Sequence, residues 1–392
     1  MIDFNNIETA FKYKSTKDLK KSFWLFKMIN YPLLVKIGKW KLNIAIKIGF
    51  PIKWIIKPTV FKQFCGGETI EECQSTIQNL AQYNVKTILD YSKEGLKSEI
   101  SFEETKNEIS KTIELAKKEN NISFAVFKMT GIADFDILEK YSKSDILNEE
   151  EEIKLKKIRQ RTEYICQKAF DNNIPVFIDA EESWIQSAID NIVYEMMQKF
   201  NKNEAIVFNT IQLYRNDRIT YLKNVINKAK ADGIKLGFKL VRGAYMEKER
   251  ERAVKLNYPS PINNTKQDTD DVYNDAINTC IENIDVVSVC VATHNENSTL
   301  LTIQLMQKLG IPITDKRVYF AQLLGMSDHL SFNLSNAGYK VSKYVPYGPV
   351  VDVMPYLIRR AQENTSIAGQ TGRELSLISS ELRRRKQQKS LK

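Results

Sequence analysis

Two segments of the sequence carry residues suited to binding a small anionic molecule. Lys239–Tyr245 reads Lys-Leu-Val-Arg-Gly-Ala-Tyr and has the character of a buried strand that ends in a glycine and an aromatic residue. Tyr356–Thr365 has the character of a helix that carries two adjacent arginines, Arg359 and Arg360. Two neighbouring guanidiniums are costly to hold together unless an anion binds them, and arginine grips a carboxylate through a planar fork of donors. The pair therefore predicts a site for a carboxylate.

The same helix also carries an acidic residue. Arg359 and Glu363 are four residues apart and share a helix face, whereas Arg360 lies about 100° around the axis. An Arg-Arg pair by itself is also typical of a solvated, charged helix. Together with the segment Lys239–Tyr245, the pair favours a binding site instead.

Eight apolar runs rich in Val, Ile and Phe predict the strands that would position these side chains. Runs that are continuously apolar are typical of parallel strands buried on both faces. The runs cover residues 85–91, 122–130, 174–182, 205–214, 235–245, 286–295, 318–326 and 339–348. Helical spacing of apolar residues predicts helices between them, among others at residues 150–172, 184–200, 217–232 and 298–309.

Eight successive strand-then-helix units favour an α/β fold, a (β/α)8 barrel of the TIM type. A doubly wound sheet is the alternative, but no Gly-x-Gly-x-x-Gly motif follows any of the predicted strands. In such barrels the chemistry gathers at the carboxyl ends of the strands. Polar or ionisable residues close most of the eight runs, so the strand ends are the candidate site.

The residues at these ends fall into two sets. Lys128 joins Arg359 and Arg360 as a cation suited to a carboxylate, and Tyr245 and Tyr344 offer apolar walls. The second set offers donors suited to a ring with several carbonyl and nitrogen acceptors. Its members are Gln212, Lys239, Thr293, His294 and Asn295.

Two further positions complete the predicted pocket. Gly243 permits a planar group to approach the backbone closely, and Asp179 follows the third run. Each residue has a plain structural alternative when taken alone. Lys128 could reach solvent, His294 could be a structural residue, and Asp179 could cap the next helix. The combination favours a pocket that holds both charges.

Composition limits the classes of function. The chain has 392 residues, 43% of them hydrophobic, which supports a sizeable core. Its net charge of +10 is spread along the sequence without an RNA-binding motif, which argues against nucleic-acid binding. The five cysteines are odd in number and include no Cys-x-x-Cys, so neither a disulfide framework nor a metal site is indicated. Reduced thiols and a cytoplasmic location are the simplest expectation.

The predicted organisation has three parts. Residues 1–80 form an N-terminal helical arm, residues 81–372 form the barrel, and residues 373–392 form a basic tail that is weakly ordered at its far end. Within the arm, residues 31–62 hold seven lysines and no acid, interleaved with Trp, Leu and Ile. Two interpretations remain open: the arm packs on the barrel, or it contacts an anionic membrane surface. No run is apolar enough to span a membrane.

The motifs together resemble a known family. Lys-Leu-Val-Arg-Gly-Ala-Tyr, Ile-Asp-Ala-Glu-Glu, Ala-Thr-His-Asn and Tyr-Leu-x-Arg-Arg-x-x-Glu-Asn look like proline dehydrogenase (proline oxidase), in the family's order, over roughly residues 80–370. The run Met-Glu-Lys-Glu-Arg after Tyr245 resembles the monofunctional, eukaryotic-like branch. The large bifunctional bacterial members usually have tryptophan at position 246 and arginine at position 239, where this chain has Met246 and Lys239.

The resemblance implies an FAD enzyme that oxidises L-proline to Δ1-pyrroline-5-carboxylate. Reoxidation by a membrane quinone fits the basic N-terminal arm as a reversible contact with the inner face of the cell membrane. It implies that Lys128, Arg359 and Arg360 hold the substrate carboxylate. Tyr245 and Tyr344 would enclose the ring, and Glu363 would pair with the cations. The implied flavin-lining residues are Asp179, Gln212, Lys239, Val241, Gly243, Thr293, His294 and Asn295.

Two other functions fit the same fold. Lys128 or Lys239 could form a Schiff base in a barrel aldolase. The barrel could also be a non-catalytic scaffold for binding or membrane association. An aldolase needs no flavin and a scaffold turns over no proline, so the visible absorbance and proline turnover separate these alternatives.

Overall fold

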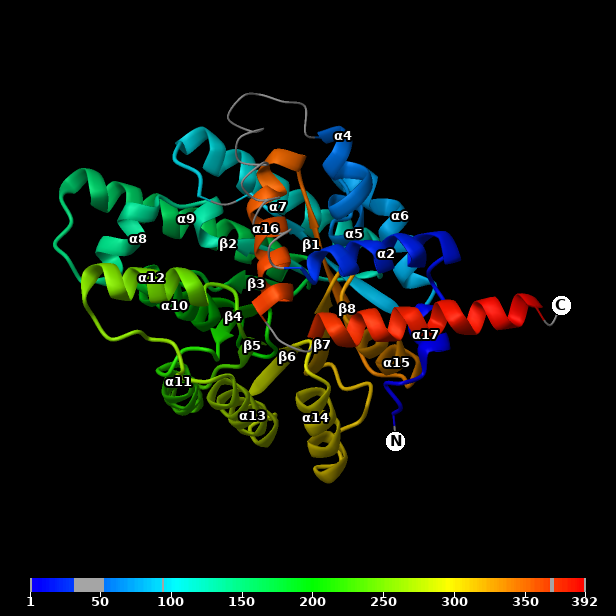
Figure 1. The fold of residues 1–392 in the computed structure, drawn as a ribbon. Coiled ribbons are helices and arrows are strands. Elements are labelled where there is room, and N and C mark those ends of the chain that lie inside the picture. The colour runs from blue at the N-terminus through cyan, green and yellow to red at the C-terminus, as the bar shows by residue number, and fades with distance from the viewer. Residues whose placement is uncertain (1, 32–52, 94, 367–369, 391–392) are drawn as a thin grey trace. The chain divides into compact units, whose positions relative to one another are not determined.

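Eight strands form the closed barrel that the sequence predicts. The computed structural model describes residues 2–31, 53–93, 95–366 and 370–390, with side chains left out at 361–371. The barrel runs in the order β1 to β8 (Figure 1). The strands are β1 Val85–Tyr91, β2 Ile122–Lys128, β3 Val176–Asp179, β4 Val207–Gln212, β5 Leu236–Val241, β6 Val287–Ala292, β7 Val318–Leu323 and β8 Val341–Tyr347.

The described residues fall into two compact units. Unit 1 comprises Met1–Thr87 and Gln322–Lys392, and unit 2 comprises Ile88–Ala321. All eight predicted strands are confirmed, and each of the seven longer apolar runs extends beyond its strand into the loops. The four predicted helices quoted above are confirmed as α9 Glu149–Asp171, α10 Ser183–Phe200, α11 Arg218–Asp232 and α14 Glu296–Lys308.

Unit 2 contains parallel strands with buried aromatic residues between them. Phe124 of β2 stacks on Phe177 of β3 at 4.1 Å between ring centroids, and both contact Phe208 of β4 edge to face. Phe124 also touches Tyr319 of β7, which does not neighbour β2 in the sheet, so these rings lie inside the barrel. Gly237 of β5 makes room for them, because a Cβ there would lie 2.4 Å from the Phe208 ring.

The remaining helices of unit 2 lie between the strands in sequence. They are α7 Glu99–Lys118, the 3-10 turn η2 Met129–Gly131, α8 Phe135–Ser142, α12 Met246–Leu256 and α13 Lys266–Glu282. Ordinary capping signals define their ends. Thr265 caps α13 through a reciprocal pair of hydrogen bonds with Asp268, and Asn148 caps α9 in the same way with Glu151.

Unit 1 joins both ends of the chain around one apolar core. Its N-terminal helices are α1 Ile7–Phe11, α2 Thr16–Ile29, α4 Lys53–Ile56, the π-helix η1 Lys57–Phe61, α5 Lys62–Phe64 and α6 Ile70–Ala81. Its C-terminal helices are α15 Asp328–Asn336, α16 Val350–Ser366 and α17 Gln370–Ser390. Phe11, Phe26 and Phe64 share the core with Leu357 and Ile378. The described part of the predicted arm therefore packs against the C-terminal helices.

The expectation of a weakly ordered tail was wrong. Residues 370–390 form α17, which packs against α1 and α2 and is red in Figure 1. Arg385 of α17 donates to the carbonyl oxygens of Phe11 and Lys14, at 2.8 and 2.9 Å. Glu381, which is fully buried, accepts hydrogen bonds from Arg384 and Arg385. Tertiary contacts thus order a segment whose sequence is strongly basic.

A buried ion-pair cluster fixes α15 in the same unit. Asp328 lies 2.9 Å from both Lys14 and Lys343 and accepts a hydrogen bond of 2.7 Å from the Tyr13 hydroxyl. Burial alone would raise the pKa of Asp328, but the two lysines and the Tyr13 hydroxyl hold it well below its usual value. The cluster joins α15 and β8 to the chain just after α1.

Candidate active site

Four charged residues meet at the carboxyl ends of strands in unit 2; Asp90, Asp179 and Lys239 are buried and Lys128 is half-buried. The Lys128 ammonium lies 3.3 Å from Oδ2 of Asp179 and 3.5 Å from Oδ2 of Asp90. The Lys239 ammonium donates to Oδ1 of the same Asp179. The residues form an alternating row of two carboxylates and two ammoniums, Asp90, Lys128, Asp179 and Lys239. Such a row balances its own charge within a site sheltered from water.

Strand register brings the row together. Lys128 and Asp179 are paired positions on β2 and β3. Lys239 lies on β5, where it pairs with Thr210 of β4. Lys128 and Asp179 follow Phe124 and Phe177 at even spacing, so they share the barrel's interior face. The Lys239 ammonium lies 5.0 Å from the centre of the Phe177 ring. The aromatic layer therefore forms the floor beneath the charged row.

Asp90 is a functional candidate that sequence reasoning missed. It lies at the end of β1, is 1% exposed, and receives a hydrogen bond of 3.1 Å from the Ser92 hydroxyl. Burial raises the pKa of Asp90, against the opposing effect of Lys128. Within the described part of the chain its Oδ1 has no hydrogen-bond partner. The available signal was an acidic residue at the end of an apolar run, as at Asp179.

Residues at the ends of the two neighbouring strands, β2 and β4, hydrogen-bond to the loop after β3. The Glu181 carboxylate accepts hydrogen bonds from the backbone N–H and the hydroxyl of Thr130, at 2.9 and 2.5 Å. The Gln212 side chain donates to the carbonyl of Glu181 at 2.6 Å and to the Tyr214 hydroxyl at 2.8 Å. Gln212 is thus buried at the predicted place, but its amide N–H groups bind this chain's own atoms.

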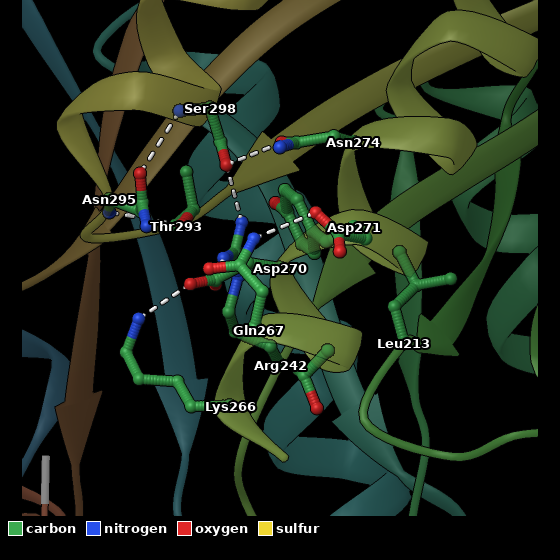
Figure 2. Close-up of polar contacts among 12 residues, drawn as sticks. Leu213, Arg242, Lys266, Gln267, Asp270, Asp271, Asn274, Thr293, Asn295 and Ser298 are labelled. Atoms are coloured by element: carbon green, nitrogen blue, oxygen red, sulfur yellow. Dashed lines mark hydrogen bonds and ion pairs between the residues drawn. The ribbon is translucent and has the colours of Figure 1, made fainter. Parts of the chain in front are cut away.

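The ends of β5 and β6 lie together in Figure 2. Asn295 caps α14, because its side chain accepts the N–H of Ser298 at 3.0 Å, and its own N–H donates to the Thr293 hydroxyl at 3.1 Å. Thr293 is buried, whereas His294 and Val241 are half-buried. Tyr245, at 9% exposure, immediately precedes α12. The β5 and β6 residues are therefore where the sequence predicts them.

The backbone at Gly243 has room for a planar cofactor beside the ends of β5 and β6. Its φ is +99°, a conformation that favours glycine, and a Cβ built there would meet no atom within 4 Å. The space beside this backbone is open, and the buried Lys239 ammonium and Thr293 hydroxyl stand on the neighbouring strand ends. Open space, a cation and a hydroxyl are a suitable set for a flavin ring. The residues fit the implied cofactor.

The other predicted substrate residues belong to unit 1. Tyr344 is buried on β8. On α16, Arg359 is half-buried, and Arg360 is buried with its guanidinium 5.1 Å from the centre of the Tyr356 ring. Glu363 lies in the same helix, but its side chain is outside the described residues. Arg360 is thus not part of a solvated helix face.

Comparisons with known proteins show which family this chain resembles. Residues 73–373 match a family model described as proline dehydrogenase. Proline dehydrogenase 1, mitochondrial, of Dictyostelium discoideum is 33% identical over 418 residues, which cover 95% of this chain and 73% of that protein. Hydroxyproline dehydrogenase of Xenopus laevis is 30% identical over 413 residues, which cover 96% of this chain and 89% of that protein.

A solved structure supports the fold. The crystal structure of proline utilization A (PutA) from Bdellovibrio bacteriovorus, inactivated by N-propargylglycine, matches with a TM-score of 0.72. The match covers 92% of this chain at 21% identity, and this chain spans 38% of that longer one. At this identity the likeness concerns the barrel fold alone.

Proposed function

Because the chain belongs to the proline dehydrogenase family, we propose that it oxidises L-proline to Δ1-pyrroline-5-carboxylate with FAD as its cofactor. The observation that carries the proposal is the largely buried row of Asp90, Lys128, Asp179 and Lys239 at the strand ends. A site for an amino acid and a flavin needs fixed charges away from water, and an aldolase would instead need one isolated, uncharged lysine.

The substrate residues would bind and orient the amino acid. Lys128, Arg359 and Arg360 hold its carboxylate, each through a charge-assisted hydrogen bond. Tyr245 and Tyr344 enclose the pyrrolidine ring and exclude water, and both are buried. Glu363 would pair with the cations in the proposed site. Because Asp179 and Asp90 already balance Lys128, the ammonium keeps its position before substrate arrives.

The cofactor residues would hold the flavin. A bound flavin would supply the hydride acceptor. Lys239 places a cation at the end of β5, and Asp179 fixes that cation through a hydrogen bond. Gly243 leaves the backbone approachable. The full cofactor set is Asp179, Gln212, Lys239, Val241, Gly243, Thr293, His294 and Asn295.

A quinone is the electron acceptor in this proposal, with the protein cytoplasmic and in reversible contact with the anionic inner face of the cell membrane. Among the described residues, no helix is long and apolar enough to cross a bilayer. Support for surface contact comes from exposed apolar residues of unit 1. Trp24, Met28 and Tyr31 recur at helical spacing along and just after α2, and Trp54 and Ile55 are exposed on α4.

Acidic residues of unit 1 pair with some lysines of the basic segment 31–62. Lys36, Lys39, Lys41 and Lys47 lie outside the described residues. Lys57 pairs with Glu68 at 2.6 Å and Glu72 at 3.0 Å, and Lys53 also pairs with Glu68. The acids that follow the basic segment therefore offset part of its charge. Apolar insertion by the aromatic residues would supply the rest of the contact.

The test is the flavin and its turnover. The purified protein should absorb in the visible range as a flavoprotein, release free FAD on acid or heat treatment, and be bleached by L-proline under anaerobic conditions. Trans-4-hydroxy-L-proline in a parallel assay separates the two activities named among the relatives. Protein that stays colourless after incubation with FAD contradicts the proposal. If the bound flavin stays oxidised when L-proline is added, L-proline is excluded as the substrate.

A further inference from the structure

The ends of β5 and β6 are joined by a continuous set of hydrogen bonds centred on Arg242. One Arg242 nitrogen donates to the Ser298 hydroxyl at 2.7 Å, and another donates to Asp270 of α13 (Figure 2). Ser298 in turn reaches the N-cap of α14, since its N–H donates to Asn295. Asn295 continues the connection to Thr293 at the end of β6. A single guanidinium therefore links two neighbouring strand ends.

Arg242 lies between residues proposed to line the cofactor but points elsewhere. Along an extended backbone successive side chains alternate, so the side chains of Val241, the last residue of β5, and Arg242 point to opposite sides. The Arg242 guanidinium instead lies 3.7 Å from the centre of the Tyr273 ring on α13. Tyr273 is fully buried, and its hydroxyl donates to the carbonyl oxygen of Leu240 at 3.0 Å. Helix α13 thus holds β5 on both sides of Val241.

Two more groups complete the anchorage of this guanidinium. Asp270 also receives the Lys266 ammonium at 2.5 Å, one turn earlier on α13. Asn274 lies one turn after Asp270 and accepts a hydrogen bond of 2.7 Å from the Ser298 hydroxyl. Asp270 and Arg242 are 14% and 16% exposed, so their ion pair is largely shielded from solvent. Shielded, charge-assisted bonds of this kind restrain geometry more than surface pairs do.

We propose that Arg242 and Asp270 are positioning residues that hold the ends of β5 and β6 in the geometry needed for flavin binding. The inference rests on the proposed function and deepens it. In this role neither side chain has to touch the cofactor. Arg242 fixes the backbone that contains Gly243, whose φ of +99° must be maintained. Through Ser298 and Asn295 it also fixes the Thr293 hydroxyl.

The matched test uses two adjacent aspartates of α13. Asp270→Asn removes the charge that holds Arg242, whereas Asp271→Asn changes an exposed residue whose contact is with Gln267 at 2.8 Å. Each apoprotein is titrated with FAD, and binding is followed by quenching of flavin fluorescence. The dissociation constant should rise about tenfold or more for Asp270→Asn, as expected for a lost charge-assisted bond, and stay within about twofold for Asp271→Asn.

Two further variants separate positioning from general destabilisation. Arg242→Met should weaken FAD binding to the same degree, and the double variant Arg242→Met/Asp270→Asn should be no weaker than either single variant. Far-UV circular dichroism and thermal melting of the apoproteins report folding independently of affinity. If Arg242→Met does not fold, the FAD affinity of Asp270→Asn alone decides whether the pair positions the strand ends.

Failure of the positioning role can be distinguished from failure of the proposed function. Wild-type protein that binds no FAD overturns both proposals. Wild-type protein that binds FAD, together with an Asp270→Asn apoprotein that is folded and binds FAD as tightly, overturns only the positioning role. A lowered melting temperature with unchanged affinity also counts against it, because a purely structural ion pair predicts that result.

Discussion

The Arg218 guanidinium binds the Asp190 carboxylate through two hydrogen bonds, of 2.8 and 3.1 Å. Both side chains are buried, and Asp190 also accepts hydrogen bonds from Gln186 and from Asn209 of β4. The pair therefore ties α10 and α11 to the barrel wall. Buried pairs of this kind are costly to break, because removing one partner leaves the other charge buried.

Asp190→Ala should destabilise the protein by about 3–5 kcal/mol, the usual cost of an uncompensated buried charge. Urea unfolding followed by circular dichroism measures the change. Lys223→Ala is the matched control on α11, since Lys223 forms a half-exposed pair with Asp275 at 2.8 Å and should cost less than about 1 kcal/mol. Equal effects of the two variants would contradict the assignment.

Arg359→Met and Arg360→Met should each raise the KM for proline and leave FAD in place. A guanidinium bond to the substrate carboxylate contributes roughly 1.5–3 kcal/mol, equivalent to a loss of about 10- to 150-fold in kcat/KM. Steady-state kinetics on flavin-replete variants measures the loss. The kcat/KM for prolinol, which lacks the carboxylate, should differ little between wild type and variants. A change below about twofold in both variants would defeat the carboxylate clamp.

Asp328 should give unit 1 a stability that depends on pH. The pKa of its carboxyl is depressed in the folded protein, so its stabilisation is fully present above the unfolded value of about 3.9 and is lost as the pH falls through the folded value. The urea midpoint of Asp328→Asn should therefore lie well below that of wild type at neutral pH, and the gap should narrow below about pH 4. With Asp271→Asn as the exposed control, a gap that stays constant into strong acid would refute this origin.

Membrane contact should depend on both charge and aromatic residues. Binding to anionic vesicles should weaken sharply with salt, since exposed charges are screened beyond about 10 Å near 0.1 M. Trp24→Ser/Trp54→Ser should reduce co-sedimentation with the vesicles, whereas Ile146→Ser should not. Ile146 is 97% exposed on unit 2 and serves as the apolar control. Equal binding to neutral and anionic vesicles would argue against an electrostatic contribution.

The strands of the fold could be predicted from the sequence, but the residues at which they end could be predicted less well. Continuous apolar runs identified all eight strands, because parallel barrel strands are buried on both faces. The run at 174–182 extends past β3, Val176–Asp179, since Glu181 and Glu182 leave the sheet but remain buried, with their carboxylates bonded to Thr130 and Lys248. Helix α17 was missed because its order depends on contacts such as Ile378 in the core, which no local pattern reveals.

The site was predictable where position in the strand determined it. Lys128, Asp179 and Lys239 were found from the rule that chemistry gathers at strand ends, and the structure brings them together. Asp90 is not predicted, because the run at 85–91 indicates a strand through its apolar residues alone, although Asp90 also lies at a strand end and is buried. The internal bonding of Gln212 was beyond sequence reasoning, because its partners are the backbone of Glu181 and the hydroxyl of Tyr214.

Unit 1 draws on both ends of the chain, and this has a consequence during synthesis. Residues up to Thr87 leave the ribosome long before Gln322–Lys392, which supply the rest of their core. At roughly 5–20 residues per second, the first helices wait on the order of ten seconds or more with Phe11 and Phe26 lacking their C-terminal partners. Nascent chains arrested at residue 321 should therefore be cleaved by protease within the first 87 residues and recruit a chaperone there.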